Sequence, residues 1–296
     1  MDAIAKMQDI ARRYQKVSGL DDRRFYSIFF SRIDPSDALV LGIKPGGDTA
    51  SWSESELASR SFYENWEHEY VDCSYPIQRT MLPFLMQVFD SDKESVRKIP
   101  KSNLSFRRAK SVDSFKDEQG MTLEEAQLEA MPFVEEIIAH VSPKIIILEG
   151  ITAFNFFCAN YGQSVSGRSA STPILTLHNG KQVRIFCEST LHVRCLGREI
   201  PIVGIGHPSY FGRKPEWKVL TQRTKEIVAK VRGGAQQSEY FVTLERGVTG
   251  KVSLSLQQHG DLIIRVRNRE AEPYKPKSQR AMAWHIVSLI EPPCEA

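Results

Sequence analysis

Two short segments hold the residue types that could do chemistry, and an apolar run precedes each of them. Residues 42–48 read Gly-Ile-Lys-Pro-Gly-Gly-Asp, and residues 207–209 read His-Pro-Ser. An imidazole can donate or accept a proton near neutral pH, and a carboxylate can activate water. A turn rich in proline and glycine can bring backbone N–H groups close to a ligand. The two segments together indicate a pocket that combines proton transfer with ligand binding.

The apolar runs predict the elements that position these segments. Residues 38–43 and 200–206 are short, branched and uncharged, which is typical of buried strands in a parallel sheet. Ligands of open α/β sheets bind beyond the carboxyl ends of the strands. We therefore expect the two segments to rim one pocket.

The rest of the chain alternates between patterns typical of helices and of strands. This order predicts an α/β fold over residues 1–232, a three-layer αβα sandwich around a central, mainly parallel sheet. Gly/Ser-rich residues 162–171 predict a loop, and Asn179-Gly180 predicts a hairpin turn. Residues 233–296 predict a small β-rich C-terminal appendage. We expect helices at residues 4–17, 76–89, 122–140, 152–161 and 216–231, and strands at 144–148, 174–177, 183–186, 241–244, 252–256, 262–266 and 283–287.

Composition favours an ordinary globular protein. The chain has 296 residues, of which 41% are hydrophobic and 25% are charged, enough for one sizeable core. It lacks an apolar run long enough to span a bilayer and a secretory signal pattern. Its five cysteines form no Cys-x-x-Cys pair. We expect a cytoplasmic monomer with no membrane contact, no obligate protein partner, no metal and no cofactor.

The distribution of charge is more informative than the net charge of +3. Basic residues exceed acidic ones in residues 91–110 and again in residues 194–232. Such stretches either contact phosphates or form an ordinary solvated surface, and both interpretations stay open.

The paired segments resemble the motifs of the uracil-DNA glycosylase superfamily. Its members carry Gly-x-x-Pro-Gly after the first core strand and His-Pro-Ser after the last, and the similarity spans roughly residues 34–232. The resemblance implies an enzyme, a DNA glycosylase that flips a damaged or modified base and hydrolyses its N-glycosidic bond. Uracil is the default base, and a modified cytosine such as a glucosylated phage base is the other possibility. The biological role would be DNA repair or antiviral defence.

The resemblance also assigns the site residues. His207 would stabilise the departing base, while Lys44 stands where relatives often carry an acidic residue or Asn. We therefore expect Asp48 to supply the carboxylate, and Lys44 to donate to a phosphate or to the base, or to attack the sugar as an amine. Base binding is expected from Gly42, Ile43, Phe62 and Asn103, whose amide would read the base edge. DNA contacts are expected from Gly46, Arg107, Arg108, Ser209, Tyr210 and Arg213.

Two other functions remain open at this point. A catalytically inactive DNA-binding or sensing protein could retain the scaffold while Lys44 replaces the chemical group. An unrelated nucleotide- or phosphate-binding enzyme could use the glycine turn, although the chain has neither a Walker pattern nor Gly-x-Gly-x-x-Gly.

Overall fold

The computed structural model describes most of the chain as two compact units, residues 1–229 and 230–296. The division falls within a helix, three residues from the expected boundary at 232. The residues that the structure describes are 2–20, 25–47, 68–73, 76–165, 174–176, 182–212, 214–233, 238–244, 248–256 and 262–267.

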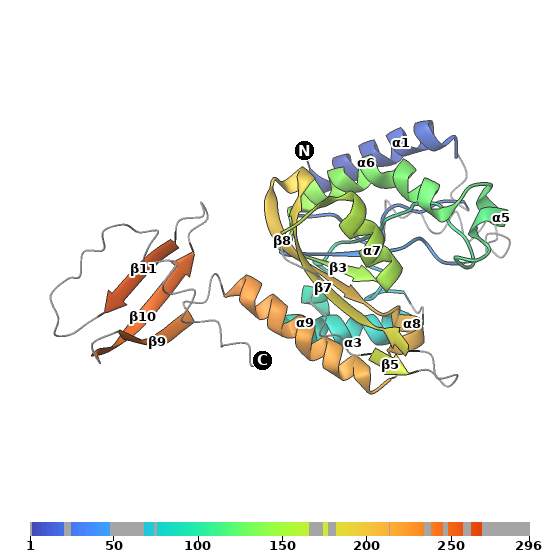
Figure 1. Ribbon diagram of the computed structural model, residues 1–296. Helices are drawn as coiled ribbons and strands as arrows, with labels where there is room; N and C mark the ends of the chain where they lie inside the picture. The colour runs from blue at the N-terminus through green and yellow to red at the C-terminus, as the bar shows by residue number, and fades with distance from the viewer. Residues whose placement is uncertain are drawn as a thin grey trace. The chain divides into compact units, whose positions relative to one another are not determined.

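A six-stranded sheet forms the centre of the first unit (Figure 1), with the order β2-β1-β3-β8-β7-β4. The first four strands in this order are parallel, while β7 is antiparallel to both β8 and β4. The bounds are β1 (Ala38–Gly42), β2 (Lys101–Asn103), β3 (Ile145–Glu149), β4 (Gly162–Ser164), β7 (Phe186–Val193) and β8 (Arg198–Ile205). The α/β prediction is therefore confirmed.

Helices cover both faces of this sheet. Figure 1 shows α1, α6 and α7 on one face and α3 and α9 on the other. None of the described helices is long and apolar enough to cross a membrane. The bounds are α1 (Ala3–Ser18), α3 (Gln78–Phe89), α4 (Lys93–Val96), α5 (Phe115–Gln119), α6 (Leu123–Val141), α7 (Ile151–Asn160), α8 (Pro208–Phe211) and α9 (Glu216–Arg232), with a 3-10 turn at Arg194–Leu196.

The alternation of side chains along the strands explains the two hydrophobic cores. In β1, Leu39 and Leu41 pack in the cluster that includes α1, α6 and α7, whereas Ala38 and Val40 pack in the cluster that includes α3 and α9. Successive strand residues point to opposite faces, so a strand covered on both sides must be apolar at every position. All five residues of β1 are buried, and so are all five of β3.

A capping box begins α6, the helix expected at residues 122–140. The Thr122 hydroxyl accepts from the Glu125 N–H at 3.2 Å, and the Glu125 carboxylate accepts from the Thr122 N–H at 2.7 Å. These bonds satisfy backbone donors that a helix leaves free at its first turn. They fix the start of the helix that leads into β3.

Three strand assignments differ from the sequence-based prediction. Gly162–Ser164 is β4 rather than loop, because it pairs with β7. Strand β7 extends to Val193, and Lys101–Asn103 is strand β2, where the sequence predicted no strand. Both edge strands of the sheet are only three residues long, so their sequences carry too little periodicity to be recognised.

The remaining strands form two small sheets. The expected hairpin is present as β5 (Ile174–Thr176) paired with β6 (Gln182–Arg184). In the second unit, β9 (Ser238–Leu244), β10 (Val248–Leu256) and β11 (Leu262–Arg267) form an antiparallel sheet. The expected strand at residues 283–287 lies outside the described residues.

An ion-pair cluster joins α1 to α6. The Glu136 carboxylate accepts from Lys6 Nζ and from the Arg13 guanidinium, each at 2.7 Å. The Arg13 hydrogen bond lowers the pKa of Glu136 to about 2, against the opposing effect of burial. The ionised form of Glu136 therefore stabilises the folded state.

We expect Glu136→Gln to lower the free energy of unfolding by about 1 kcal/mol at pH 7, because the cluster is partly exposed and screened. A folded-state pKa below the unfolded value gives a stabilisation that is lost as pH falls toward 2. The deficit of the variant should therefore shrink between pH 7 and pH 3 in urea titrations. Glu124→Gln, on an exposed position of the same helix, is the control, and a deficit independent of pH would contradict the prediction.

Candidate active site

The ends of four parallel strands bring the predicted motif residues to one edge of the sheet. Gly42 at the end of β1 is in register with Asn103 at the end of β2. Glu149 at the end of β3 is in register with Ile205 at the end of β8, two residues before His207. Chain order reverses between β1 and β3, and such a switch point is where open α/β sheets bind ligands. Gly42 and Glu149 lie at this switch point.

His207 is held by the helical turn that follows it. The N–H groups of Tyr210 and Phe211 donate to the His207 carbonyl at 3.0 and 3.2 Å, and Pro208 starts the turn. The His207 Nδ1 atom is buried and has no hydrogen-bond partner among the described residues. Burial lowers the pKa of His207, opposed by Glu149 and assisted by Lys101 and Lys44. The neutral imidazole is therefore favoured, and it lies within electrostatic range of the other strand ends.

A buried lysine, Lys101, occupies the centre of the site. Its side chain is 2% exposed, and its ammonium donates to Glu149 Oε2 at 2.9 Å, to Asn103 Oδ1 at 3.0 Å and to its neighbour's carbonyl, Ser102 O, at 2.9 Å. An ammonium has three N–H donors, so these acceptors use all of them. Because Lys101 occupies the Asn103 oxygen, the amide is oriented with its Nδ2 donor directed away from Lys101.

Glu149 is the buried counter-ion of this lysine. Its Oε1 accepts from the Tyr70 hydroxyl and its Oε2 from Lys101, so both oxygens are used. The side chains of this cluster lie close to the backbone of Gly42. A Cβ atom on Gly42 would lie 2.1 Å from Asn103 Oδ1 and 2.9 Å from Glu149 Oε2. Glycine is therefore required at position 42 because a larger side chain would collide with these groups, and not because the backbone there adopts a positive φ angle.

A second carboxylate, Glu69, lies beside the same lysine. Its Oε2 is 4.0 Å from Lys101 Nζ, which is an ion-pair contact but too long for a hydrogen bond. Burial raises the pKa of Glu69 to about 7, with Lys101 and Arg108 opposing the shift and Glu149 adding to it. Within the described residues no hydrogen bond engages this carboxylate, so it differs from Glu149 in being available to react.

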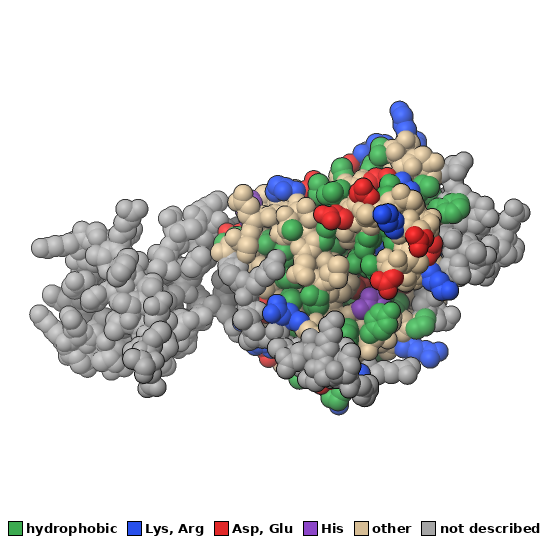
Figure 2. Space-filling model, turned by 45° about the vertical axis from the view of Figure 1, so that its right-hand side comes forward, with side chains coloured by type: hydrophobic (Ala, Val, Ile, Leu, Met, Phe, Trp, Pro, Cys, Tyr) green, Lys and Arg blue, Asp and Glu red, His purple; other side chains and the backbone are tan. Residues whose placement is uncertain are grey.

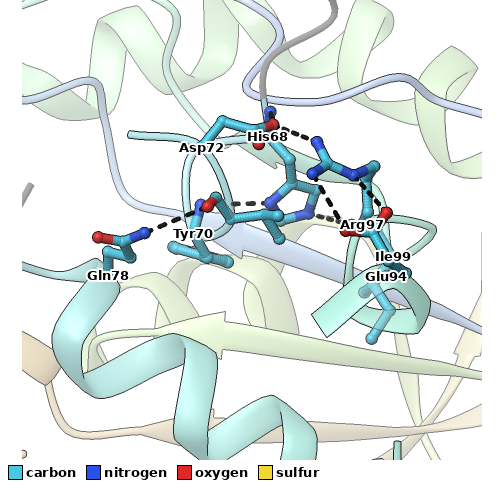
Figure 3. Close-up of polar contacts among 8 residues, drawn as sticks. His68, Tyr70, Asp72, Gln78, Glu94, Arg97 and Ile99 are labelled. Carbon is cyan, nitrogen blue, oxygen red and sulfur yellow. Dashed lines mark hydrogen bonds and ion pairs between the residues drawn. The ribbon is translucent and has the colours of Figure 1, made fainter. Parts of the chain in front are cut away.

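Residues 68–73 are anchored by a polar scaffold (Figure 3). The buried His68 donates from Nε2 to the Ile99 carbonyl at 2.9 Å, and its Nδ1 accepts from the Tyr70 N–H at 3.2 Å. Asp72 accepts from the His68 N–H at 2.9 Å and from the Arg97 guanidinium. Burial lowers the pKa of His68 to about 4, so the neutral tautomer that makes both bonds is retained. This scaffold sets the positions of Glu69 and Tyr70.

Lys44 is tied to backbone oxygens. Its ammonium donates to the carbonyls of Ala109 and, at 3.2 Å, Pro45. Burial lowers the pKa of Lys44 to about 8, opposed by Glu118 and assisted by Arg108. These contacts fasten the turn that follows β1 to residue 109.

Four of the seven basic residues in the stretch 91–110 are buried or paired, and the other three are exposed. Arg107, which we expected to contact DNA, has a buried guanidinium that binds the Glu129 carboxylate at 2.8 and 3.0 Å. Arg108 is also buried and donates to the Gly46 carbonyl. Lys101 is the centre of the site, and Arg97 pairs with Asp72 and Glu94. On the face drawn in Figure 2, acidic and basic side chains are interspersed.

The other predicted residues fall into three groups. Ser209 and Tyr210 are exposed beside His207, the Tyr210 side chain at 75%, and the Tyr210 ring lies 5.3 Å from the imidazole. Ile43 packs on the core, while Gly46 is exposed in the motif turn. Asp48, Phe62 and Arg213 lie outside the described residues.

Sequence reasoning missed Lys101, Glu149, Glu69 and Tyr70. One signal was present for Glu149, because a lone acid follows the apolar residues 145–148 at the carboxyl end of a buried strand. Lys101 had no comparable signal, since it stands in a stretch whose overall basic charge suggested surface. No cluster of His, Cys, Asp and Glu that could hold a metal ion occurs among the described residues.

No protein-family model matches this chain, and no curated protein matches its sequence significantly.

We expect Lys101→Met to lower the free energy of unfolding by about 3–5 kcal/mol, because it leaves Glu149 buried without its counter-ion. Lys144→Met is the control, since Lys144 pairs with Asp37 at 3.0 Å but is half exposed, and it should cost under about 1 kcal/mol. Urea unfolding at pH 7 measures both, and equal effects would contradict a special role for the buried pair.

The His68 scaffold should make stability sensitive to pH. The folded state holds His68 neutral, so the unfolded chain takes up a proton first as pH falls below about 6.5, and stability is lost. Relative to His68→Gln, the wild-type protein should lose about 2 kcal/mol more between pH 7 and pH 5. Chemical denaturation at the two pH values tests this, and parallel losses in both proteins would contradict it.

Proposed function

We propose that this protein is a DNA glycosylase, an enzyme that extrudes a damaged or modified base from DNA and hydrolyses its N-glycosidic bond. The observation that carries the proposal is the meeting of His207, the Asn103 amide and two carboxylates at the switch point between β1 and β3. Breaking this bond builds positive charge on the sugar and negative charge on the base. The site has groups suited to both charges.

His207 and Asn103 would stabilise the negative charge that develops on the departing base. A neutral imidazole keeps one N–H donor, which can bind a carbonyl oxygen of the base as negative charge develops there. The Asn103 amide, oriented by Lys101, would offer its Nδ2 donor to another acceptor on the same base. Together they favour a base that presents carbonyl oxygens.

Contacts with DNA would come from the exposed turn after His207. Ser209 could bind a backbone phosphate, and the exposed Tyr210 ring has the size and position to fill the space left in the stack by the flipped base. The Gly46 turn lies at the end of β1, where backbone N–H groups can meet phosphate. Lys44 and Arg108 would support that turn from beneath.

The substrate class follows from these donors. Uracil and hypoxanthine present carbonyl oxygens at the edges that His207 and Asn103 would read. A bulky modified cytosine is the alternative substrate, and it would fit a role in antiviral defence where uracil would fit DNA repair. We propose that the protein acts on DNA in the cytoplasm as a monomer.

The decisive experiment measures base release. Purified protein is incubated with single- and double-stranded oligonucleotides that contain uracil, hypoxanthine or glucosylated hydroxymethylcytosine. Free base is measured by mass spectrometry and abasic sites by alkaline cleavage. Release from one of these substrates is expected, and His207→Ala should slow it by about 100-fold or more.

The matched control is His192→Ala, because His192 is exposed and pairs with Glu199 near the start of β8, whereas His207 follows the end of that strand. A protein–DNA adduct that borohydride traps with the wild-type protein and not with Lys44→Ala would show attack by the Lys44 amine in place of water. DNA binding without release from any substrate would overturn the glycosylase proposal and favour a catalytically inactive DNA-binding or sensing protein.

A further inference from the structure

We infer that Glu69 is the catalytic carboxylate of this site, the group that takes a proton from the water attacking the sugar. The inference rests on the proposed glycosylase function. It assigns the catalytic carboxylate to Glu69, because Lys44 stands where related proteins often carry an acidic residue or Asn. It starts from a difference between the two carboxylates that flank Lys101.

Glu149 is fully engaged and Glu69 is not. Both Glu149 oxygens accept hydrogen bonds, from Tyr70 and from Lys101, and its side chain is 4% exposed. The Glu69 side chain is 15% exposed and touches Lys101 only at 4.0 Å. Protonation of Glu149 would neutralise the counter-ion of Lys101 and leave that buried ammonium without an opposite charge in hydrogen-bond contact. Glu69 can bind water and receive its proton without breaking the Lys101–Glu149 pair.

The charged groups around Glu69 set its pKa in a range suited to a general base. The groups that face it are Lys101 on β2, Glu149 on β3, Arg108 after β2 and the neighbouring Tyr70. Burial and Glu149 raise its pKa, and the two cations oppose the rise. A general base is most effective when its pKa lies near the working pH. The backbone of Glu69 is also fixed, because its N–H donates to the Phe30 carbonyl at 2.9 Å.

The proposed step balances as a hydrolysis. The water oxygen bonds to C1′ of the deoxyribose as the bond from C1′ to the base nitrogen breaks. The electron pair of that bond goes to the base, whose carbonyl oxygen is stabilised by the His207 N–H. The water proton goes to Glu69, and the base then takes up a proton from solvent or from Glu69. The products are an abasic site and the free base.

The test is a single-turnover measurement of base release between pH 5 and pH 9. The wild-type rate should rise with pH and level off above about 7, because the ionised carboxylate is the active form. Glu69→Gln should be slower by about 100-fold or more and should lose that rise. Glu69→Asp should retain part of the rate, and formate should partly restore Glu69→Ala by replacing the missing carboxylate.

Glu135→Gln is the matched control, because Glu135 forms a partly exposed pair with Arg194 at 3.3 Å outside the site, and its rate should equal the wild-type rate. Circular dichroism and thermal melting establish that each variant folds. If the wild-type protein releases base and Glu69→Gln keeps both rate and pH profile, the inference is overturned while the glycosylase function stands. If the wild-type protein releases no base from any substrate, both fail.

Discussion

The ion pair between Lys101 and Glu149 is the interaction on which the site depends. Two charges removed from water are tolerated only when they meet each other and fill their remaining hydrogen bonds. Lys101 meets this condition with three acceptors, and Glu149 meets it with Lys101 and Tyr70. Because these partners come from the ends of β2 and β3 and from residues 68–73, the hydrogen bonds of this one ion pair align three segments of the chain.

The same constraint links catalysis to stability. His68 and Asp72 fasten the segment that supplies Tyr70 to Glu149, and this segment also carries Glu69. A change that loosens the scaffold would therefore move the proposed base as well as the counter-ion. Polar groups that would cost free energy if left unpaired thus become the framework that positions the reactive ones.

The sequence predicted the helices and strands of the central sheet better than it predicted the buried polar residues of the site. Buried strands β1 and β3 and the capped helix α6 were recognisable because apolar runs and capping residues act locally. The meeting of Asn103 with Gly42 depended on strand pairing, which the sequence alone leaves open. Lys101 and Arg107 looked like surface cations, and their burial could not be foreseen because Glu149 and Glu129 lie far along the chain.

The short outer strands of the central sheet have a consequence for association. β2 and β4 have three residues each, and β2 is further flanked by the bridge between Phe29 and Ser102. Open strands with long rows of free N–H and C=O groups recruit further strands and lead to aggregation. Among the described strands, β2 and β4 each offer only a short row of such groups to another polypeptide. Growth of the sheet by addition of a strand to β2 or to β4 is thereby disfavoured.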